Sequence, residues 1–211
     1  MPRSQRAILI AAVVVAVAYA WLRGAFISVS AAPVPEPAVP ATASVATFAA
    51  GCFWSAEQLF EGLPGVFSVV SGYTGGTVPN PTYEQVSAGA TGHAEAVEVR
   101  YDPARITYAA LLDRFWHDVD LFAAHQQFCD LGDQYRPAVF VHDAAQRALA
   151  ESSRRQWRDR FQRPIQVEVA DAGPFYAAEA YHQNYAARHP LQYSFYRWSC
   201  GRDRRLHDIW Q

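Results

Sequence analysis

The hydrophobic pattern of residues 47–210 alternates between the two-residue period of strands and the wider spacing of helices. Residues 93–103 alternate regularly and end at an Asp-Pro pair, which closes a strand. Residues 107–119 instead place one apolar stripe on a helical face, formed by Leu111, Leu112, Phe115 and Trp116. The pattern predicts strands at 47–51, 93–103, 137–143 and 164–171, and a strand followed by a glycine-rich loop at 66–76. It predicts helices at 52–61 and 107–119, a polar-faced helix at 144–161, and a helix or helical turns at 175–189.

Residues 120–136 follow neither period, and such a long connection is usually functional or flexible. The tail at 193–210 has a mixed pattern. Because strands and helices interleave with hairpin-like sections, we predict an α+β fold in which helices pack on a mixed, mostly antiparallel sheet.

Residues 1–30 form a separate segment in which two arginines precede an apolar run at 7–22. The run is shorter than the ~20 residues of a full membrane span. One interpretation is an uncleaved signal-anchor, and the other is a signal peptide cleaved near the small residues 28–32. Both would carry the rest of the chain across the membrane, so we expect an extracytoplasmic, periplasmic location with membrane contact through this segment only.

Residues 31–46 are rich in alanine and contain four prolines. Proline-rich composition favours an extended, semi-rigid tether over packed structure. We therefore place the folded domain at 47–211, with its boundary near Thr47.

Composition limits the class of this domain. The chain has 211 residues, of which 51% are hydrophobic and 14% aromatic, so it can form a substantial core. A net charge of −2 without clustered basic residues argues against nucleic-acid binding. Three cysteines leave at least one unpaired within a monomer, and the absence of a C-x-x-C pair argues against a structural zinc site, so we expect no metal.

Cys52 is a candidate nucleophile because it stands where a predicted strand turns into a predicted helix. The free N–H groups and dipole of a helix start lower a thiol pKa, and Gly51 permits the sharp turn. The alternative is a small buried core residue. Phe53 and Trp54 cannot both face the core, since adjacent helical positions point about 100° apart, so at least one lines a surface or cleft.

Glu95 is a candidate general acid. It shares one face of the predicted strand with Val97, Val99 and Tyr101, which make that face the buried one. Burial without a cation raises the pKa of a carboxyl, and a protonated carboxyl near neutral pH can donate a proton. The alternative is a strand-end position exposed to solvent.

Together these stretches resemble the type A peptide methionine sulfoxide reductases. The resemblance runs from about Thr47 to Tyr185, and the tail resembles the ending of one branch of that family. The matching segments, in the family's order, are "GCFWSAEQLF", "GYTGG", "PTYEQV", "TGHAEAVEVRYDP", "LLDRFW", "CDLGDQYRPAVF" and "YHQNY".

The resemblance implies a ferredoxin-like two-layer α/β sandwich with extra helices and coil. It implies reduction of methionine S-sulfoxide, free or in proteins, by a monomer that binds no cofactor and uses a thioredoxin-like reductant. The resemblance implies that Cys52 is the nucleophile and Glu95 the acid, and that Tyr83 and Tyr135 donate hydrogen bonds to the sulfoxide oxygen. It also implies that Phe53 and Trp54 form the pocket for the substrate methyl group, and that Asp130 is a polar group in the same pocket.

A second thiol is needed to resolve the sulfenic acid that would form on Cys52. We favour Cys200, in the polar tail, as this second thiol. Cys129 is the less favoured alternative, because many relatives carry asparagine at that position. Ser55 is a second departure, since glycine is commoner in the family.

Two other classes compete with the reductase. A thiol hydrolase would pair Cys52 with His93, although we expect His93 and His182 to be structural hydrogen-bonding residues. The other class is a non-catalytic binding module on a membrane stalk. Such a module would not need the residues with implied catalytic roles, which are Cys52, Glu95, Tyr83 and Tyr135.

Overall fold

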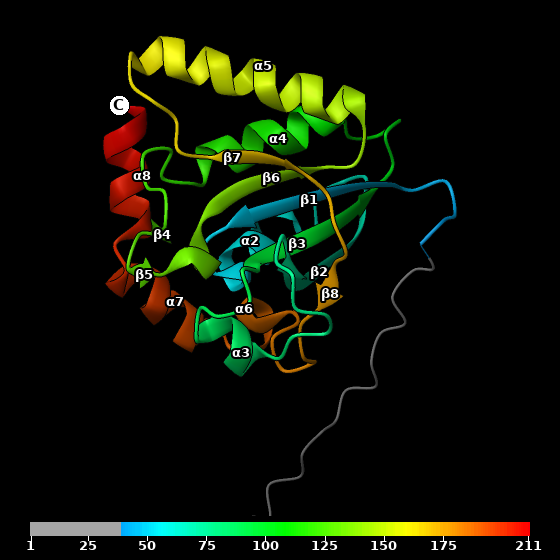
Figure 1. The fold of residues 1–211 in the computed structure, drawn as a ribbon, viewed down its shortest axis with the longest axis vertical. Coiled ribbons are helices and arrows are strands. Elements are labelled where there is room, and N and C mark those ends of the chain that lie inside the picture. The colour runs from blue at the N-terminus through cyan, green and yellow to red at the C-terminus, as the bar shows by residue number, and fades with distance from the viewer. Residues whose placement is uncertain (1–38) are drawn as a thin grey trace, which may run out of the picture. The chain divides into compact units, whose positions relative to one another are not determined.

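A six-stranded sheet forms the centre of the domain (Figure 1). The computed structural model describes residues 39–211, so the predicted apolar segment and most of the predicted tether lie outside the described residues. In spatial order the strands are β7 (Glu168–Asp171), β6 (Pro137–Val141), β1 (Ser44–Ala50), β3 (Ala94–Tyr101), β2 (Val66–Thr74) and β8 (Tyr176–Ala177). The β6–β7 pair is parallel and the other pairs of this sheet are antiparallel, which confirms the predicted mixed, mostly antiparallel α+β fold.

Helices and a small ribbon surround this sheet. In Figure 1, α5 runs along the top above α4, and α7 and α8 lie on the left beside the β4–β5 ribbon. The helices are α2 (Phe53–Phe60), α3 (Tyr83–Ser87), α4 (Tyr108–His117), α5 (Ala144–Phe161), α6 (Tyr185–Arg188), α7 (Pro190–Ser199) and α8 (Arg202–Trp210). The ribbon pairs β4 (Gln126–Gln127) with β5 (Asp130–Leu131), and a 3₁₀ turn, η1, follows at Asp133–Tyr135.

The main core lies between one sheet face and the helices α2 and α4. Phe48 of β1 is fully buried, and its ring stacks on Phe60 at 5.1 Å and on Phe115 at 5.2 Å between centroids. The opposite face carries a smaller cluster in which alanines and Phe140 pack under Phe175. β3 is therefore covered on both sides where it carries Glu95, which makes this position a buried one.

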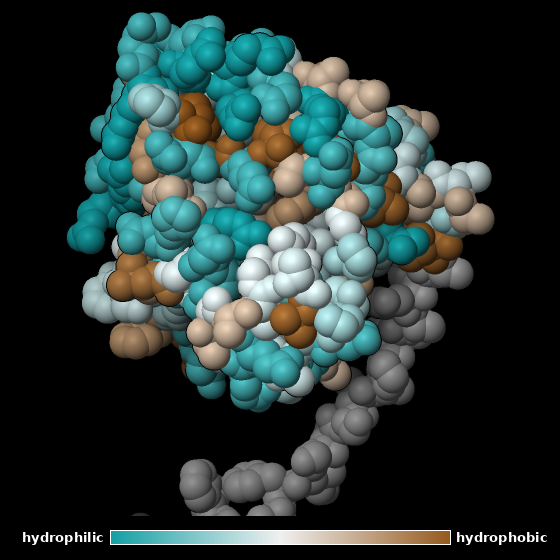
Figure 2. Space-filling view, viewed as in Figure 1, coloured by the Kyte–Doolittle hydropathy of each residue, from teal (hydrophilic) through white to brown (hydrophobic). Residues whose placement is uncertain are grey.

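The outer side of α5 is mostly hydrophilic, as the top of Figure 2 shows. This agrees with the polar face predicted for residues 144–161, of which only Gln146 and Ala150 are fully buried. Within residues 39–211, no helix combines the length and the apolar character that crossing a bilayer requires.

The prediction of a helix or helical turns at 175–189 is confirmed at 180–188, where turns lead into a short helix, and is wrong before that. Residues 176–177 instead form β8 on the edge of β2, and only 185–188 are helical. Gln183 explains the difference, because its side-chain amide accepts from the Ser71 N–H at 3.0 Å and donates to the Ser71 carbonyl at 2.9 Å. Pairing with the edge of β2 thus outweighs local helix propensity.

Two further boundaries differ from the prediction. β1 begins at Ser44, inside the segment predicted as tether, because Ser44 already pairs with Tyr101 of β3. The short helix α3 was not predicted, although Thr82 and Gln85 form a capping box at its start.

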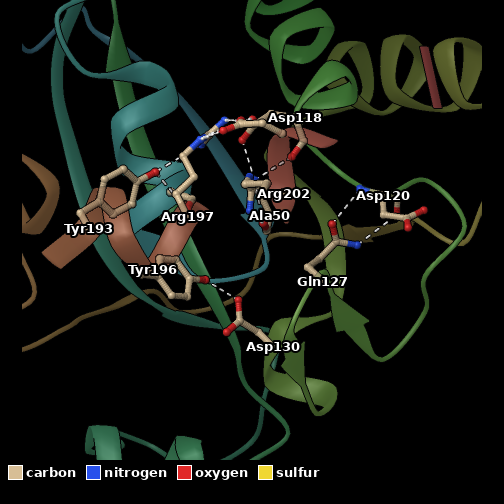
Figure 3. Close-up of polar contacts among 11 residues, drawn as sticks. Ala50, Asp118, Asp120, Gln127, Asp130, Tyr193, Tyr196, Arg197 and Arg202 are labelled. Carbon is tan, nitrogen blue, oxygen red and sulfur yellow. Dashed lines mark hydrogen bonds and ion pairs between the residues drawn. The ribbon is translucent and has the colours of Figure 1, made fainter. Parts of the chain in front are cut away.

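The C-terminal tail is attached to the sheet by a buried guanidinium (Figure 3). Arg202 is 2% exposed, and its Nη2 lies 2.6 Å from both the carbonyl and the carboxylate of Asp118. The same group donates to the Ala50 carbonyl at 3.4 Å, at the end of β1. The guanidinium also lies over the Phe128 ring, 4.4 Å from its centroid. These contacts fix the start of α8 beside the end of β1.

We expect Arg202→Ala to lower the free energy of unfolding by about 3–5 kcal/mol, because the buried Asp118 carboxylate loses its 2.6 Å partner and keeps, among the described residues, only the ion pair with Arg197 at 3.7 Å. Arg205→Ala is the matched control on the same helix, since Arg205 pairs with Asp120 at 2.7 Å but its side chain is 43% exposed. That variant should lose less than about 1 kcal/mol. Urea unfolding of both variants checks this, and equal losses would contradict the anchoring role of Arg202.

Candidate active site

Cys52, the candidate nucleophile, lies at a tight strand-to-helix turn. β1 ends at Ala50, Gly51 has φ +82°, and Cys52 is the N-cap residue of α2. A Cβ on Gly51 would lie 2.5 Å from the Cβ of Gln127, so both the backbone angle and the close packing require glycine. Cys52 is a free thiol and is 7% exposed. The predicted helix start at Cys52 is confirmed.

Glu95 points into the site from β3. It is 2% exposed, and its Oε2 accepts a hydrogen bond from the Phe53 N–H at 3.0 Å. Burial raises the pKa of Glu95 to about 8, with a further rise from Asp130, while the Phe53 N–H lowers it. The carboxyl is thus protonated at neutral pH. The predicted inward orientation is confirmed, and the alternative of a solvent-exposed strand end is wrong.

The electrostatic environment of Cys52 differs from the expectation. Burial raises the pKa of the thiol, and the charges of Glu95 and Asp130 raise it further. The Tyr196 hydroxyl and the Trp54 N–H lower the pKa, but they do not offset burial. The predicted lowering by the helix start is therefore wrong for this state, because water is excluded from the sulfur. Protonation of Glu95 removes one of the two negative charges that raise the pKa of Cys52.

As predicted, Phe53 and Trp54 do not both face the core. Phe53 is buried, and Trp54 faces the site. Phe53 is 1% exposed, with its ring 4.9 Å from the imidazole of His182. Trp54 is half-buried and stacks on Tyr185 at 3.7 Å with an 8° tilt. Its Nε1 donates to His182 Nδ1 at 3.2 Å. His182, which the sequence suggested only as structural, thus orients the indole.

Tyr83, Tyr135 and Asp130 come from three separate elements, α3, η1 and β5, and gather around the same sulfur. Burial raises the pKa of both tyrosines, and the charges of Glu95, Cys52 and Asp130 add to the rise in each. Burial also raises the pKa of Asp130, while Tyr196 and Arg202 lower it. These charge effects place Tyr83, Tyr135 and Asp130 in one cluster with Cys52 and Glu95, and their roles stay predictions.

Cys129 and Cys200 form a disulfide that spans 71 residues of sequence, with their Cα atoms 4.9 Å apart. Both candidate resolving thiols are therefore bonded to each other while Cys52 is free. Asp130 and the two sulfurs lie within 4.8 Å, a grouping that could hold a metal ion. In the disulfide the sulfurs offer no thiolate to an ion.

The two histidines are engaged away from Cys52. The Nδ1 atom of His93 accepts from Gly76 N–H at 3.1 Å, and its Nε2 donates to the Val78 carbonyl at 2.8 Å. This ring therefore holds a loop in place. His182 accepts from Trp54 Nε1 through Nδ1, so its proton sits on Nε2, which has no partner among the described residues. The ring lone pair of each histidine is therefore already used and is not available as the base of a thiol hydrolase.

A buried thiol beside a protonated carboxyl, with a nearby disulfide, defines a thiol-dependent oxidoreductase on an α+β scaffold. The family model described as peptide methionine sulfoxide reductase matches residues 44–211. The chain belongs to this family, and its activity is the reduction of methionine sulfoxide.

Relatives and solved structures agree with this membership. Peptide methionine sulfoxide reductase MsrA 2 of Caulobacter vibrioides is 47% identical over 190 residues, covering 90% of this chain and 96% of the relative. MsrA of Bacillus licheniformis is 45% identical, covering 79% of this chain and 93% of the relative. Reduced Mxr1 from Saccharomyces cerevisiae superposes with a TM-score of 0.67 at 30% identity, over 72% of this chain and 88% of that one. Methionine sulfoxide reductase A of Corynebacterium diphtheriae gives 0.65 at 32% identity, over 72% and 77%.

The pKa of Glu95 predicts a pH-dependent stability. Burial raises this pKa from 4.5 to about 8, so between these values the unfolded carboxyl ionises while the folded one stays protonated. We expect the parent to lose stability relative to Glu95→Gln as pH rises from 4.5 to about 8, and to lose no more above that. Urea unfolding of both proteins across this range measures the difference. A constant difference would show that Glu95 ionises normally.

Proposed function

We propose that Cys52 attacks the sulfur of methionine S-sulfoxide, and that Glu95 delivers a proton to the sulfoxide oxygen. The observation that carries this assignment is the hydrogen bond from Phe53 N–H to Glu95 Oε2, 3.0 Å, which places a protonated carboxyl next to the residue that bears the thiol. As the sulfur–oxygen bond breaks, the oxygen passes to Cys52, methionine leaves, and a sulfenic acid remains on Cys52.

Hydrogen-bond donors and an apolar wall complete the proposed site. The hydroxyls of Tyr83 and Tyr135 would donate to the sulfoxide oxygen, since burial raises the pKa of both and both stay protonated. The rings of Phe53 and Trp54 form the surface for the substrate methyl group. Asp130 supplies a polar contact at the rim. Water exclusion strengthens each of these interactions.

A relay through two cysteines accounts for the disulfide. Cys200 attacks the sulfenic sulfur of Cys52 and water leaves, giving a Cys52–Cys200 disulfide. Cys129 then attacks Cys200, which forms the Cys129–Cys200 bond and returns Cys52 as a thiol. The alternative order, with Cys129 attacking first, leads to the same final disulfide. The bonded pair and the free Cys52 match the end of either order.

An external dithiol completes the cycle, and a thioredoxin-like protein is the proposed reductant. Cys129 is exposed, so an incoming thiolate can reach this disulfide. The apolar run at 7–22 supports export, so we infer an extracytoplasmic enzyme attached by, or released from, its N-terminal segment. An exported domain would meet an extracytoplasmic partner. We further infer that the enzyme acts as a monomer.

Glu95→Gln should slow the first turnover by about 100- to 10,000-fold, because the amide cannot donate an acidic proton. The ratio of parent to variant rate should fall as pH rises through about 8, where Glu95 itself ionises. Single-turnover assays with a methionine sulfoxide peptide measure both effects. Equal rates for parent and variant would remove Glu95 as the acid.

Cysteine variants should reveal the order of the relay. After one equivalent of sulfoxide, Cys129→Ser should accumulate a Cys52–Cys200 disulfide, and Cys200→Ser should retain a sulfenic acid that dimedone traps. Peptide mass mapping identifies each product. Cys52→Ser is the control, because it should release no methionine. A trapped sulfenic acid in Cys129→Ser, with a Cys52–Cys129 disulfide in Cys200→Ser, would reverse the order.

A further inference from the structure

One face of α7 is directed into the active site. Tyr193, Tyr196 and Cys200 follow at intervals of three and four residues, so they share a helical face. Tyr193 is 3% exposed, whereas Phe195 and Trp198 on the opposite face are 68% and 74% exposed. Tyr196 thus points inward, although sequence analysis assigned it no role.

The Tyr196 hydroxyl is bound within the site. It donates to Asp130 Oδ2 at 2.5 Å, as Figure 3 shows, and it lies near enough to Cys52 to lower the pKa of the thiol. Its ring meets the edge of Trp54 at 6.1 Å between centroids. Tyr196 therefore covers the thiol on the side where Trp54 and Asp130 lie, and Cys52 is only 7% exposed.

A covalent bond holds this contact in place. Cys129 directly precedes Asp130, and Cys200 lies one turn after Tyr196, with the Cys200 N–H donating to the Tyr196 carbonyl at 2.9 Å. The Cys129–Cys200 disulfide and the Asp130–Tyr196 hydrogen bond therefore join the same two short segments. While the disulfide is intact, α7 cannot move Tyr196 away from Cys52.

We propose that Tyr196 is a redox-dependent cover of the active site, which the Cys129–Cys200 disulfide holds over Cys52 until an external dithiol reduces it. This inference rests on the proposed function. It adds a residue from the C-terminal tail to the site and makes substrate access depend on the redox state of two other cysteines.

The chemistry of the cycle supplies a reason for such a cover. In the disulfide state no thiol remains to resolve a sulfenic acid on Cys52. A second sulfoxide admitted then would leave Cys52 oxidised and open to further oxidation to sulfinic acid. Reduction by a dithiol breaks the Cys129–Cys200 bond, returns two thiols and oxidises the dithiol to its own disulfide. The same step that restores resolving capacity thus frees Tyr196.

Alkylation of Cys52 tests the cover without requiring turnover. The full chain is either oxidised with diamide, with the Cys129–Cys200 bond verified by peptide mapping, or reduced with dithiothreitol and desalted. Initial rates of Cys52 labelling by iodoacetamide are then measured by mass spectrometry. We expect labelling of the oxidised form to be at least about tenfold slower, the order that one hydrogen bond to a charged group contributes to an equilibrium. The Cys129→Ser/Cys200→Ser double variant should label at the reduced rate under both treatments.

Tyr196→Phe removes the hydroxyl and should raise labelling of the oxidised form about tenfold, and Tyr196→Ala should do so at least as strongly. Tyr193→Phe is the matched control on the same helix face, because its hydroxyl bonds Ser55 and Arg197 instead, and it should keep the parent's oxidised-to-reduced ratio. Equal labelling of oxidised and reduced parent, or unchanged protection in both Tyr196 variants, would overturn the proposal. Protection without sulfoxide turnover would instead contradict the proposed function alone.

Discussion

The buried guanidinium of Arg202 is the contact on which the arrangement of the site depends. It joins the Ala50 carbonyl at the end of β1, two positions before the nucleophile, to Asp118 and to the start of α8. A buried charge of this kind is stable only when paired and hydrogen-bonded, and the acceptors around Arg202 meet that condition at its two Nη groups, while its buried Nε has no hydrogen-bond partner among the described residues. Because α7 leads directly into α8, this anchor also determines where Cys200 and Tyr196 lie.

Burial determines the protonation of the groups that this anchor brings together. Desolvation raises the pKa of Cys52, Glu95 and Asp130, and each carboxylate charge raises the pKa of its neighbours. Asp130 alone has a compensating cation, since Arg202 lowers its pKa. The site therefore assigns different protonation states to similar groups, with a neutral acid at Glu95 and a neutral thiol at Cys52. A bound sulfoxide would offer its polar oxygen as an acceptor for the proton that Glu95 carries.

Local pattern was sufficient to predict the strand and helix that flank Cys52, and the period of β3 correctly turned Glu95 inward. The capping box of α3 was also present in the sequence, at Thr82 and Gln85. The rest depends on contacts between distant segments. The Gln183 amide pairs with Ser71, 112 positions away, and so overrides a helical pattern. Arg202 and Tyr196 look like ordinary tail residues until the fold places Asp118 and Asp130 beside them.

The three cysteines differ in exposure in a way that suits their chemistry. Cys52 is buried, Cys200 is half-buried and Cys129 is exposed. Sulfoxide reduction needs a dry site, because water would weaken the interactions that polarise the sulfur–oxygen bond. Reduction by another protein needs the opposite, a sulfur that an incoming thiolate can reach. A single cysteine cannot satisfy both conditions in one position, so the proposed relay would let Cys52 stay covered while the Cys129–Cys200 pair meets the proposed reductant.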